Sequence, residues 1–524
     1  MIINKIKRTA FCFSLLAAVS CTDNFNEVNT NKVGASDDQL AQDYNTIKAP
    51  FKPAFNRLFI SDVTWMYQIQ QSLQADGWSG YMTTPNAFGG ISNHNYLLNP
   101  GWNGYAWDDA YTAIIANMYK VEQLSKGKYD NFYAWSLIIK GATLQRMTDM
   151  YGPAVMSSFG TEGDALYDSQ KDIYTQIFKD LDFAVNDLQS RIAADEASTF
   201  ADTDLSSYKG SYALWVKYAN SLRLRMAVRI SKVDPAMAKS EAEKSVNNAI
   251  GVFTTNGDVL KIKSPVDLNV IDVMSHAWGG LFMGADMESI LGGYDDPRMA
   301  YYWNTSAIAP GKYKGVRTGI VYPTPQTYSK FSQTGARTKT GEVTWMTTAE
   351  VYFLRAEGAL RGWNMGGTAK DLYESGIRAS FEQNGLAGAD GYISDNVKIA
   401  KDYVDLVNSE FNAPAVNNIT VAWNEAASNE VKLQKIITQK WIATYPDGQE
   451  AWSEYRRTGY PKLFRITNNQ SDGVISTEFG VRRLPFAASE IANNPKGVES
   501  GKAALGGPDN GATRLWWDAD KANF

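Results

Sequence analysis

The sequence predicts a mainly α-helical protein: a tetratricopeptide-like repeat scaffold of about four helix pairs that carries an irregular, loop-rich lobe. Amphipathic runs with helical spacing recur along the chain, and several of them follow one another in pairs. Long stretches rich in Gly, Asn and aromatic residues, near 76–105, 253–345 and 459–524, interrupt these pairs. Because a helix pair must bury its apolar face against a neighbour, repeated pairs indicate one stacked core.

The first element is a signal peptide of the lipoprotein type over residues 1–20. Three basic residues precede an apolar run of about ten residues (10–19), and small residues at 18–20 precede Cys21. Such a run is too short to cross about 30 Å of hydrocarbon. We therefore expect cleavage before Cys21 and lipid attachment to its thiol. A plain secretory signal cut near Ala18 and an uncleaved anchor are the alternatives.

Residues 21–39 are expected to form the lipidated cysteine and a flexible tether, because this segment is polar, Asn-rich and without helical periodicity. Residues 40–524 are expected to form a single helical body with ligand-binding loops. No later window reaches 18 apolar residues without a charge, so attachment to a membrane depends on the N-terminus.

Helix starts are marked by capping boxes. Ser169 with Asp172 precedes apolar residues that recur every three to four positions, and Thr347 with Glu350 precedes a second such run. A break at Gly366 leads into a further helix over 369–381. The predicted pairs are 106–125 with 131–151, 169–192 with 211–231, and 347–360 with 369–381.

Composition excludes several classes of function. The net charge of -5 and pI near 5.4 argue against a nucleic-acid partner, and both cysteines lie within the first 21 residues. Only two histidines occur, His94 and His276, and no metalloprotease, P-loop, nucleophile-elbow or dinucleotide motif is present. We therefore expect no metal, no cofactor and no catalytic residue. The 56 acidic residues leave a surface glycoside hydrolase open as an alternative.

Nine or more motifs, in a fixed order, make the chain similar to a known family. They include TDMYGP at 148–153, KYANSLRLRMAVRIS at 217–231, DDPRM at 295–299, VRRLPF from 481 and RLWWD at 514–518. The chain resembles the SusD/RagB family of nutrient-binding outer-membrane lipoproteins from Cys21 nearly to its end. The arginines in these motifs, such as Arg225, Arg229 and Arg457, are interpreted as scaffold that binds carboxylates or carbonyls.

The resemblance implies a non-catalytic lipoprotein, lipid-anchored in the outer membrane and facing the cell exterior. Such a protein closes like a lid over a TonB-dependent (SusC-like) outer-membrane β-barrel and delivers captured nutrient to it. In that family the ligand is commonly an oligosaccharide and sometimes a peptide. An arc of aromatic residues holds the ligand, and no fixed site motif can be transferred.

Candidate site residues follow from the chemistry of sugars. A pyranose stacks its C–H face on an aromatic ring, and its hydroxyls need amides or carboxylates at the rim. Two stretches supply such groups, one over 76–107, which also contains Asn95 and Tyr105, and one near 278–303. The alternative is that these rings only cover the scaffold. The predicted ligand-binding residues are Trp78, Tyr81, Asn86, Phe88, Asn93, Tyr96, Trp102, Trp278, Tyr294 and Trp303.

Overall fold

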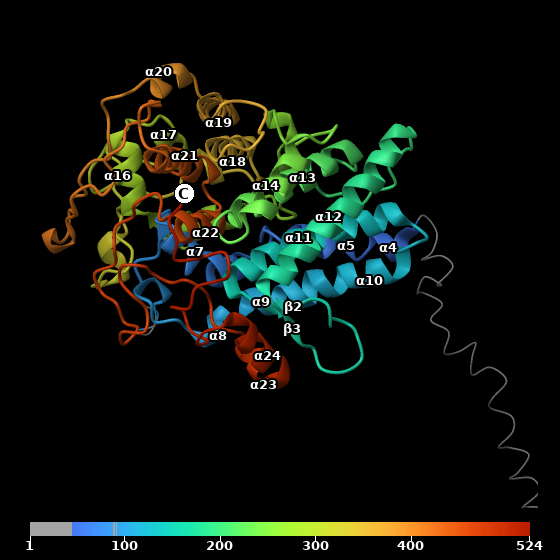
Figure 1. Cartoon of the computed structure of the whole chain (residues 1–524). Coiled ribbons are helices and arrows are strands. Elements are labelled where there is room, and N and C mark those ends of the chain that lie inside the picture. The colour runs from blue at the N-terminus through green and yellow to red at the C-terminus, as the bar shows by residue number, and fades with distance from the viewer. Residues whose placement is uncertain (1–43, 87, 89, 91) are drawn as a thin grey trace, which may run out of the picture. The chain divides into compact units, whose positions relative to one another are not determined.

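The computed structural model describes residues 44–86, 88, 90 and 92–524 (Figure 1). The chain divides into two units, residues 1–49 and 50–524. In the first unit the described part is 44–49, with helix α4 (Asn45–Lys48). The predicted signal peptide, Cys21 and the tether at 21–39 lie outside the described residues. None of the described helices combines the length and apolar character needed to cross a membrane.

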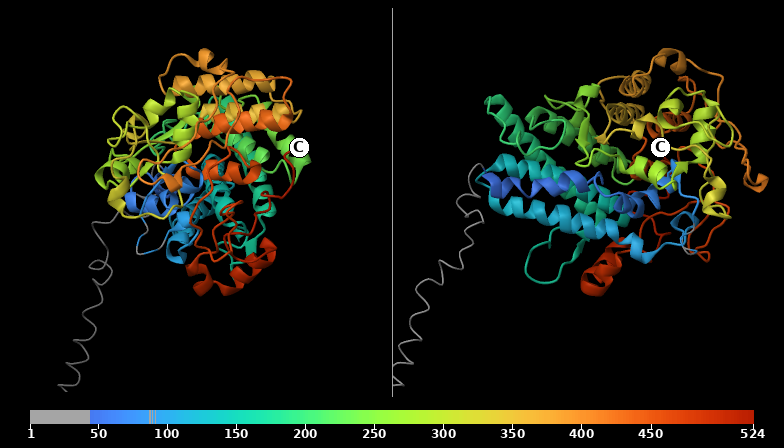
Figure 2. Two further views of the ribbon diagram at one scale, coloured as in Figure 1. Left: turned by 90° about the vertical axis from the view of Figure 1, so that its left-hand side faces the viewer. Right: turned by 180° about the vertical axis from the view of Figure 1, so that it is seen from behind.

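The second unit is mainly helical, which confirms the predicted fold class. Its long helices form pairs in which each helix packs against the next one along the chain. The views in Figures 1 and 2 show α10, α11 and α12 running side by side. The long helices are α10 (Ala116–Ser125), α11 (Asp130–Tyr151), α12 (Gln170–Ala193), α13 (Tyr212–Arg229), α14 (Pro235–Val246), α18 (Thr348–Leu360), α19 (Ala369–Gln383), α21 (Asn429–Thr444) and α22 (Gly448–Thr458).

Shorter elements connect these helices and build the loop-rich lobe. The helices are α5 (Phe51–Arg57), α6 (Thr64–Tyr67), α7 (Ala75–Trp78), α8 (Pro100–Asn103), α9 (Tyr105–Asp109), α15 (Val270–Asp272), α16 (Ala285–Gly293), α17 (Arg298–Tyr302), α20 (Ala389–Ile393), α23 (Ala488–Asn493) and α24 (Pro495–Leu505). Three π-helical stretches are η2 (Gln68–Ser72), η4 (Ala110–Ile115) and η6 (Val273–Ala277), and the 3-10 turns are η3 (Asn93–Asn95), η5 (Asn256–Asp258), η7 (Pro325–Tyr328), η8 (Ala336–Thr338) and η9 (Ser409–Phe411).

Sheet structure in the described residues consists of three antiparallel pairs of short strands and four isolated β-bridges. The strand pairs are β1 (Met82–Thr83) with β5 (Phe282–Met283), β2 (Ala154–Val155) with β3 (Tyr167–Asp168), and β4 (Leu260–Lys263) with β6 (Glu342–Met346). The β4–β6 pair joins segments about eighty residues apart, with Leu260 opposite Met346.

Both predicted capping boxes start helices. The Ser169 hydroxyl accepts the Asp172 backbone N–H at 3.1 Å, and the Thr347 hydroxyl accepts that of Glu350 at the same distance. These bonds satisfy donors that the first helical turn leaves unpaired. The predicted helix over 106–125 differs, because it contains the π-helical stretch η4. There the Thr112 hydroxyl donates to the Asp108 carbonyl at 2.6 Å, and such side-chain donors compete with the main-chain ladder.

A buried ion network ties the helices together. Arg225 of α13 donates two hydrogen bonds to Glu350 of α18, at 2.7 and 2.8 Å. Arg229, one turn later, binds Glu450 at 2.5 Å and Glu454 at 2.6 Å, both on α22. All five side chains are at most 4% exposed. The interpretation of these arginines as scaffold is confirmed.

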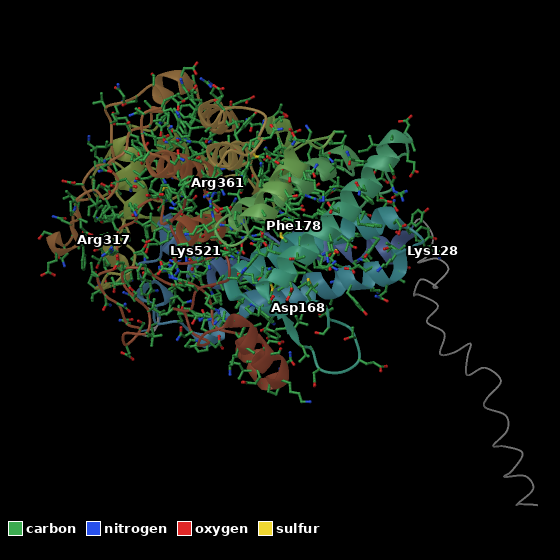
Figure 3. All side chains as sticks on the ribbon, in the orientation of Figure 1. Lys128, Asp168, Phe178, Arg317, Arg361 and Lys521 are labelled. Atoms are coloured by element: carbon green, nitrogen blue, oxygen red, sulfur yellow. The ribbon has the colours of Figure 1, made fainter. Side chains whose placement is uncertain are left out.

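The other sequence motifs are also structural. Trp517 near the C-terminus donates its indole N–H to Asp149 of α11 at 2.7 Å, which joins the RLWWD and TDMYGP motifs. In the DDPRM motif, Arg298 donates to both carboxylate oxygens of Asp296 at 2.9 and 2.6 Å. Side chains fill the space between the ribbons, and Phe178 of α12, 4% exposed, lies among them (Figure 3). The motifs therefore specify the fold rather than a surface site.

Candidate ligand-binding site

Six of the ten residues predicted to bind ligand lie in the interior. Their polar atoms are largely bonded within the protein: Trp78 donates its indole N–H to the Asn93 carbonyl at 3.1 Å, and the Tyr294 hydroxyl donates to the Ile419 carbonyl at 3.0 Å. Tyr81, Tyr294 and Trp303 are at most 2% exposed and offer no ring face to a ligand at the surface. Trp78 and Tyr96 are 8% exposed and line a small cavity. The six buried residues are Trp78, Tyr81, Asn93, Tyr96, Tyr294 and Trp303.

The other four predicted residues reach solvent. Trp278, directly after η6, is 48% exposed. Phe88 and Trp102 are half-buried and contact each other edge to face, with ring centroids 5.8 Å apart and planes at 87°. Asn86 is half-buried and lies two positions before Phe88 in the sequence. The structure thus brings together Phe88 and Trp102 from the first predicted stretch.

Two exposed rings extend this set. Trp65 of α6 is 47% exposed and Tyr105 of α9 is 39% exposed, and their centroids lie 5.7 Å apart with planes at 83°. Sequence reasoning missed Trp65, which lies outside both predicted stretches. One signal was available: Trp65 begins a short run that also contains Tyr67, Gln68, Gln70 and Gln71, so rings and amides occur together there.

Neighbouring elements carry these rings. Helix α6 packs against α15, and η2, which continues α6, packs against α8 and α9. Helix α15 continues into η6, which ends next to Trp278. We call the set Trp65, Phe88, Trp102, Tyr105 and Trp278 the aromatic platform. Its rings offer the flat apolar faces on which pyranoses stack.

The amides of the first stretch hold the loop that carries the platform. Asn93 accepts the Asn99 backbone N–H at 2.8 Å and donates to Asn103 at 3.1 Å. Asn99 in turn caps α8, the helix of Trp102, by accepting the Gly101 N–H at 2.8 Å. Asn95 donates to the Ile320 and Asn468 carbonyls at 3.1 and 2.9 Å. These bonds fix the position of the loop and of the rings it carries. They leave few side-chain amides free at the edge of the aromatic platform to bind sugar hydroxyls.

His94 supports the same loop. Its Nε2 lies 3.0 Å from the Ser72 carbonyl oxygen, and burial lowers the pKa of the imidazole to about 4. A Cβ placed on Gly77 would lie 2.2 Å from this ring, so only glycine fits there. The neutral, buried imidazole of His94 therefore holds its loop against Ser72 and Gly77.

Carboxylates beside the platform are already engaged. Asp109 lies 3.4 Å from both the Arg57 guanidinium and the Gln70 amide, and Asp108 accepts the Ser489 hydroxyl at 2.6 Å. Across the described part of the chain, no group of three or more His, Cys, Asp or Glu side chains is placed to hold a metal ion. The exposed rings can stack against a flat ligand.

The fold is a helical repeat scaffold that carries exposed aromatic rings, and comparison with known families identifies the class of protein. The family model for SusD-like proteins, described as Susd and RagB outer membrane lipoprotein, matches residues 27–518. The chain belongs to this family, whose members are binding proteins of the outer membrane. No curated protein sequence matches the chain.

Solved structures support the same family assignment. A chitin-binding SusD homologue from Flavobacterium johnsoniae is 55% identical, with a TM-score of 0.90 over 91% of this chain and 100% of its own. SusD homologues from Bacteroides vulgatus and Bacteroides uniformis are each 36% identical, with TM-scores of 0.87 and 0.83. They cover 92% and 91% of this chain and 99% of their own. Family and neighbours together support a glycan-binding lipoprotein.

Proposed function

We propose that this protein captures an oligosaccharide on the aromatic platform and delivers it, unmodified, to a TonB-dependent (SusC-like) outer-membrane transporter. The observation that carries the proposal is the exposure of Trp65, Tyr105 and Trp278 on packed, neighbouring elements. Isolated exposed rings are common, but a group of them on neighbouring elements marks an interaction site. Family membership supports the transporter as partner.

The ligand we propose is a chitin oligosaccharide. The F. johnsoniae homologue is described as chitin-binding and shares 55% of its residues with this chain over its whole length. Chitin units present an apolar pyranose face and an acetamido group, which suit aromatic rings and hydrogen-bond donors. A peptide is the alternative ligand within the same family.

Attachment and location are also part of the proposal. The pattern of small residues before Cys21 and the family description support a lipid on Cys21 and residence in the outer membrane. We place the platform on the outer side of the cell, where polymer fragments arrive.

We propose binding without turnover. Asp108 and Asp109, the carboxylates within the platform's own helix, already bond to protein partners. A glycosidase needs two carboxyl groups flanking the bond it cleaves, one of them free to donate a proton. A surface glycoside hydrolase would instead shorten its ligand, which chromatography detects.

An array of chitin, starch, xylan and peptide ligands tests the assignment with the purified mature protein. We expect signal from chitin oligosaccharides, loss of that signal in Trp65→Ala/Trp278→Ala, and no loss in Phe183→Ala. Phe183 on α12 is a matched control because it is an exposed ring, at 39%, outside the platform. Signal from peptides alone would contradict the glycan assignment. For the partner, mild-detergent purification is expected to recover a large β-barrel, and recovery of this protein alone would argue against it.

A further inference from the structure

Trp278 differs from the other four rings of the aromatic platform in how it is held. Trp65 with Tyr105, and Phe88 with Trp102, support each other edge to face, with ring centroids 5.7 and 5.8 Å apart. Trp278 is 48% exposed. Within the part of the chain that the structure describes, it contacts no other aromatic ring and its indole N–H donates no hydrogen bond. The position of the Trp278 ring therefore depends on the backbone that carries it.

The chain that follows Trp278 provides no support for this ring. Gly279, with φ +64°, and Gly280 come next, and a Cβ on either residue would meet no atom within 4 Å beyond its chain neighbours. Leu281, at 1% exposure, is the first buried residue after Trp278. Because glycine restricts the backbone least, two successive open glycines leave the ring to be fixed from its N-terminal side.

On that side, Ser275 and His276 at the end of η6 bind a buried neighbouring segment. The Thr334 backbone N–H donates to the Ser275 hydroxyl at 3.1 Å, and the Gln333 side-chain amide donates to the Ser275 carbonyl. The His276 Nε2 lies 2.9 Å from the Thr334 carbonyl oxygen, which also accepts the Asn304 side-chain amide at 2.9 Å. Thr334 has no exposed surface, so these bonds attach the end of η6 to the protein core.

Two oxygen atoms determine which nitrogen of His276 carries the proton. The Thr334 carbonyl oxygen lies 2.9 Å from Nε2, and an Asp272 carboxylate oxygen lies 3.4 Å from it. A carbonyl and an ionised carboxylate only accept, so Nε2 is the donor. The same Asp272 oxygen lies 3.2 Å from the Lys339 ammonium group, which leaves Thr334 as the closer acceptor for His276.

We propose that His276 is a positioning residue of the ligand-binding site. Its Nε2–H, donated to the Thr334 carbonyl, fixes the backbone from which the Trp278 ring reaches the ligand. This hydrogen bond gives Trp278 the support that the other four rings obtain from each other. A ring that is fixed before binding removes an entropy cost that binding would otherwise have to offset. The inference rests on the proposed function, because it assumes that Trp278 contacts a captured glycan.

The position of the proton is measured first. The chain has two histidines, so ¹⁵N-histidine in the purified mature protein gives two sets of ring signals, and His276→Gln identifies those of His276. At pH 8 we expect the proton of the His276 ring on Nε2. A tautomer protonated at Nδ1 would overturn the proposal, because Nε2 could then not donate to Thr334.

Binding of a chitin hexamer is then compared in two variants of His276. Gln offers an amide N–H close to the position of Nε2, whereas Leu offers no donor. We expect His276→Leu to bind about threefold to tenfold more weakly, and His276→Gln to bind within about twofold of wild type. Asn256→Leu is the matched control: Asn256 donates to the Ala379 carbonyl at 3.0 Å from η5, which packs against α13 and α19. Its loss should leave the affinity unchanged.

A double-mutant cycle shows whether His276 acts through Trp278. In a Trp278→Ala background, His276→Leu is expected to have no further effect on affinity. An additional loss of about threefold or more in that background would show that His276 supports the fold in general, and would overturn the proposal. Equal affinities of His276→Leu and His276→Gln in the wild-type background would overturn it as well.

A measurement without ligand guards against misfolding. Circular dichroism shows whether each variant is folded, and His276→Asn, whose shorter amide does not reach Thr334, is a milder second variant. With ¹⁵N-tryptophan, 15 indole signals are expected, and Trp278→Ala identifies the signal of Trp278. Its heteronuclear NOE should fall in His276→Leu and His276→Asn and stay unchanged in His276→Gln. An unchanged NOE in all three would contradict the positioning role.

The outcomes separate this inference from the proposed function. Weaker binding in Trp278→Ala, but not in folded His276→Leu or His276→Asn, contradicts the positioning role and leaves glycan capture on the platform intact. Unchanged affinity in Trp278→Ala, or no binding of the hexamer by wild type, contradicts the proposed function and this inference together.

Discussion

Arg457 of α22 donates two hydrogen bonds of 2.7 Å to the two carboxylate oxygens of Glu357 on α18. Both side chains are at most 1% exposed, so this pair joins two helices inside the core. Bidentate pairs of this kind combine strength with fixed geometry. Each partner depends on the other, because a single buried charge without compensation is costly.

Arg457→Met is expected to lower the free energy of unfolding by about 3–5 kcal/mol, because it removes the bidentate partner of buried Glu357 and one of the cations that pair with Glu454. Urea denaturation followed by circular dichroism measures the change. Arg378→Met is the matched control: Arg378 also pairs with two carboxylates, but at 47% exposure it should cost about 1 kcal/mol or less. Equal losses in the two variants would show that burial does not decide the energetics here.

Acid is expected to unfold the protein through the same network. Burial alone would raise the pKa of Glu450, but Arg229, Lys440 and Arg225 outweigh it and lower this pKa from 4.5 to about 2. Burial also opposes ionisation of Glu454, yet Arg457, Lys440 and Arg229 hold its pKa well below its usual range. A depressed carboxyl pKa stabilises the folded state above pH 4.5, and this contribution is lost as pH falls toward 2.

Thermal unfolding between pH 2 and 7 tests this prediction. The midpoint should fall steeply below pH 4.5, and Glu450→Gln should be less stable at pH 7 with a shallower fall. A wild-type midpoint that stays constant down to pH 3 would contradict the role of the network.

The pKa of the Asp76 carboxyl is shifted in the opposite direction, upward. Burial raises the pKa of its carboxyl from 3.8 to about 8, so near neutral pH the folded state holds a proton that the unfolded chain has released. The sign is therefore reversed: this carboxyl makes stability fall as pH rises from about 4 to 8. Asp76→Asn should flatten the pH dependence in this range and make the protein at least as stable at pH 8. An unchanged slope would show that Asp76 is ionised when folded.

Local sequence signals predicted the scaffold well. The hydroxyls of Ser169 and Thr347 cap their helices as expected, because capping depends on residues three positions apart. The site was harder to predict, because ring burial depends on distant partners. The Tyr81 hydroxyl donates to the Trp441 carbonyl, 360 positions away in the sequence. The rings of Trp78 and Trp452 pack together with their centroids 4.9 Å apart. The residues next to Tyr81 and Trp78 in the sequence give no signal that predicts either contact.

The same contrast applies within each of the two predicted stretches. Trp102 and Trp278 reach solvent, whereas Trp78 and Trp303 of the same stretches are at most 8% exposed. Trp78→Ala and Trp303→Ala are therefore expected to destabilise the fold by about 3–5 kcal/mol each, as for other buried aromatics. Ligand affinity in such variants would report folding rather than stacking. Chemical denaturation of each variant separates the two effects.

Lipid attachment remains a prediction about Cys21. Cys21→Ser is expected to abolish incorporation of labelled palmitate and to release a folded body from the membrane, because stable anchoring needs two or more acyl chains. Fractionation with a carbonate wash measures the release. Continued labelling of Cys21→Ser, or its retention in the outer membrane, would contradict the anchor.

Calorimetric titration of a chitin hexamer tests the central claim most directly, with wild type compared with Trp65→Ala, Trp278→Ala and Phe183→Ala at low and high salt. We predict that each platform variant stays folded and binds about tenfold or more weakly, as for aromatic hot spots, while Phe183→Ala binds as wild type does. Affinity should be nearly independent of salt because the ligand is neutral, and the hexamer should be recovered intact. Unchanged affinity in both folded platform variants, or shortened hexamer after incubation, would contradict capture without turnover on the platform.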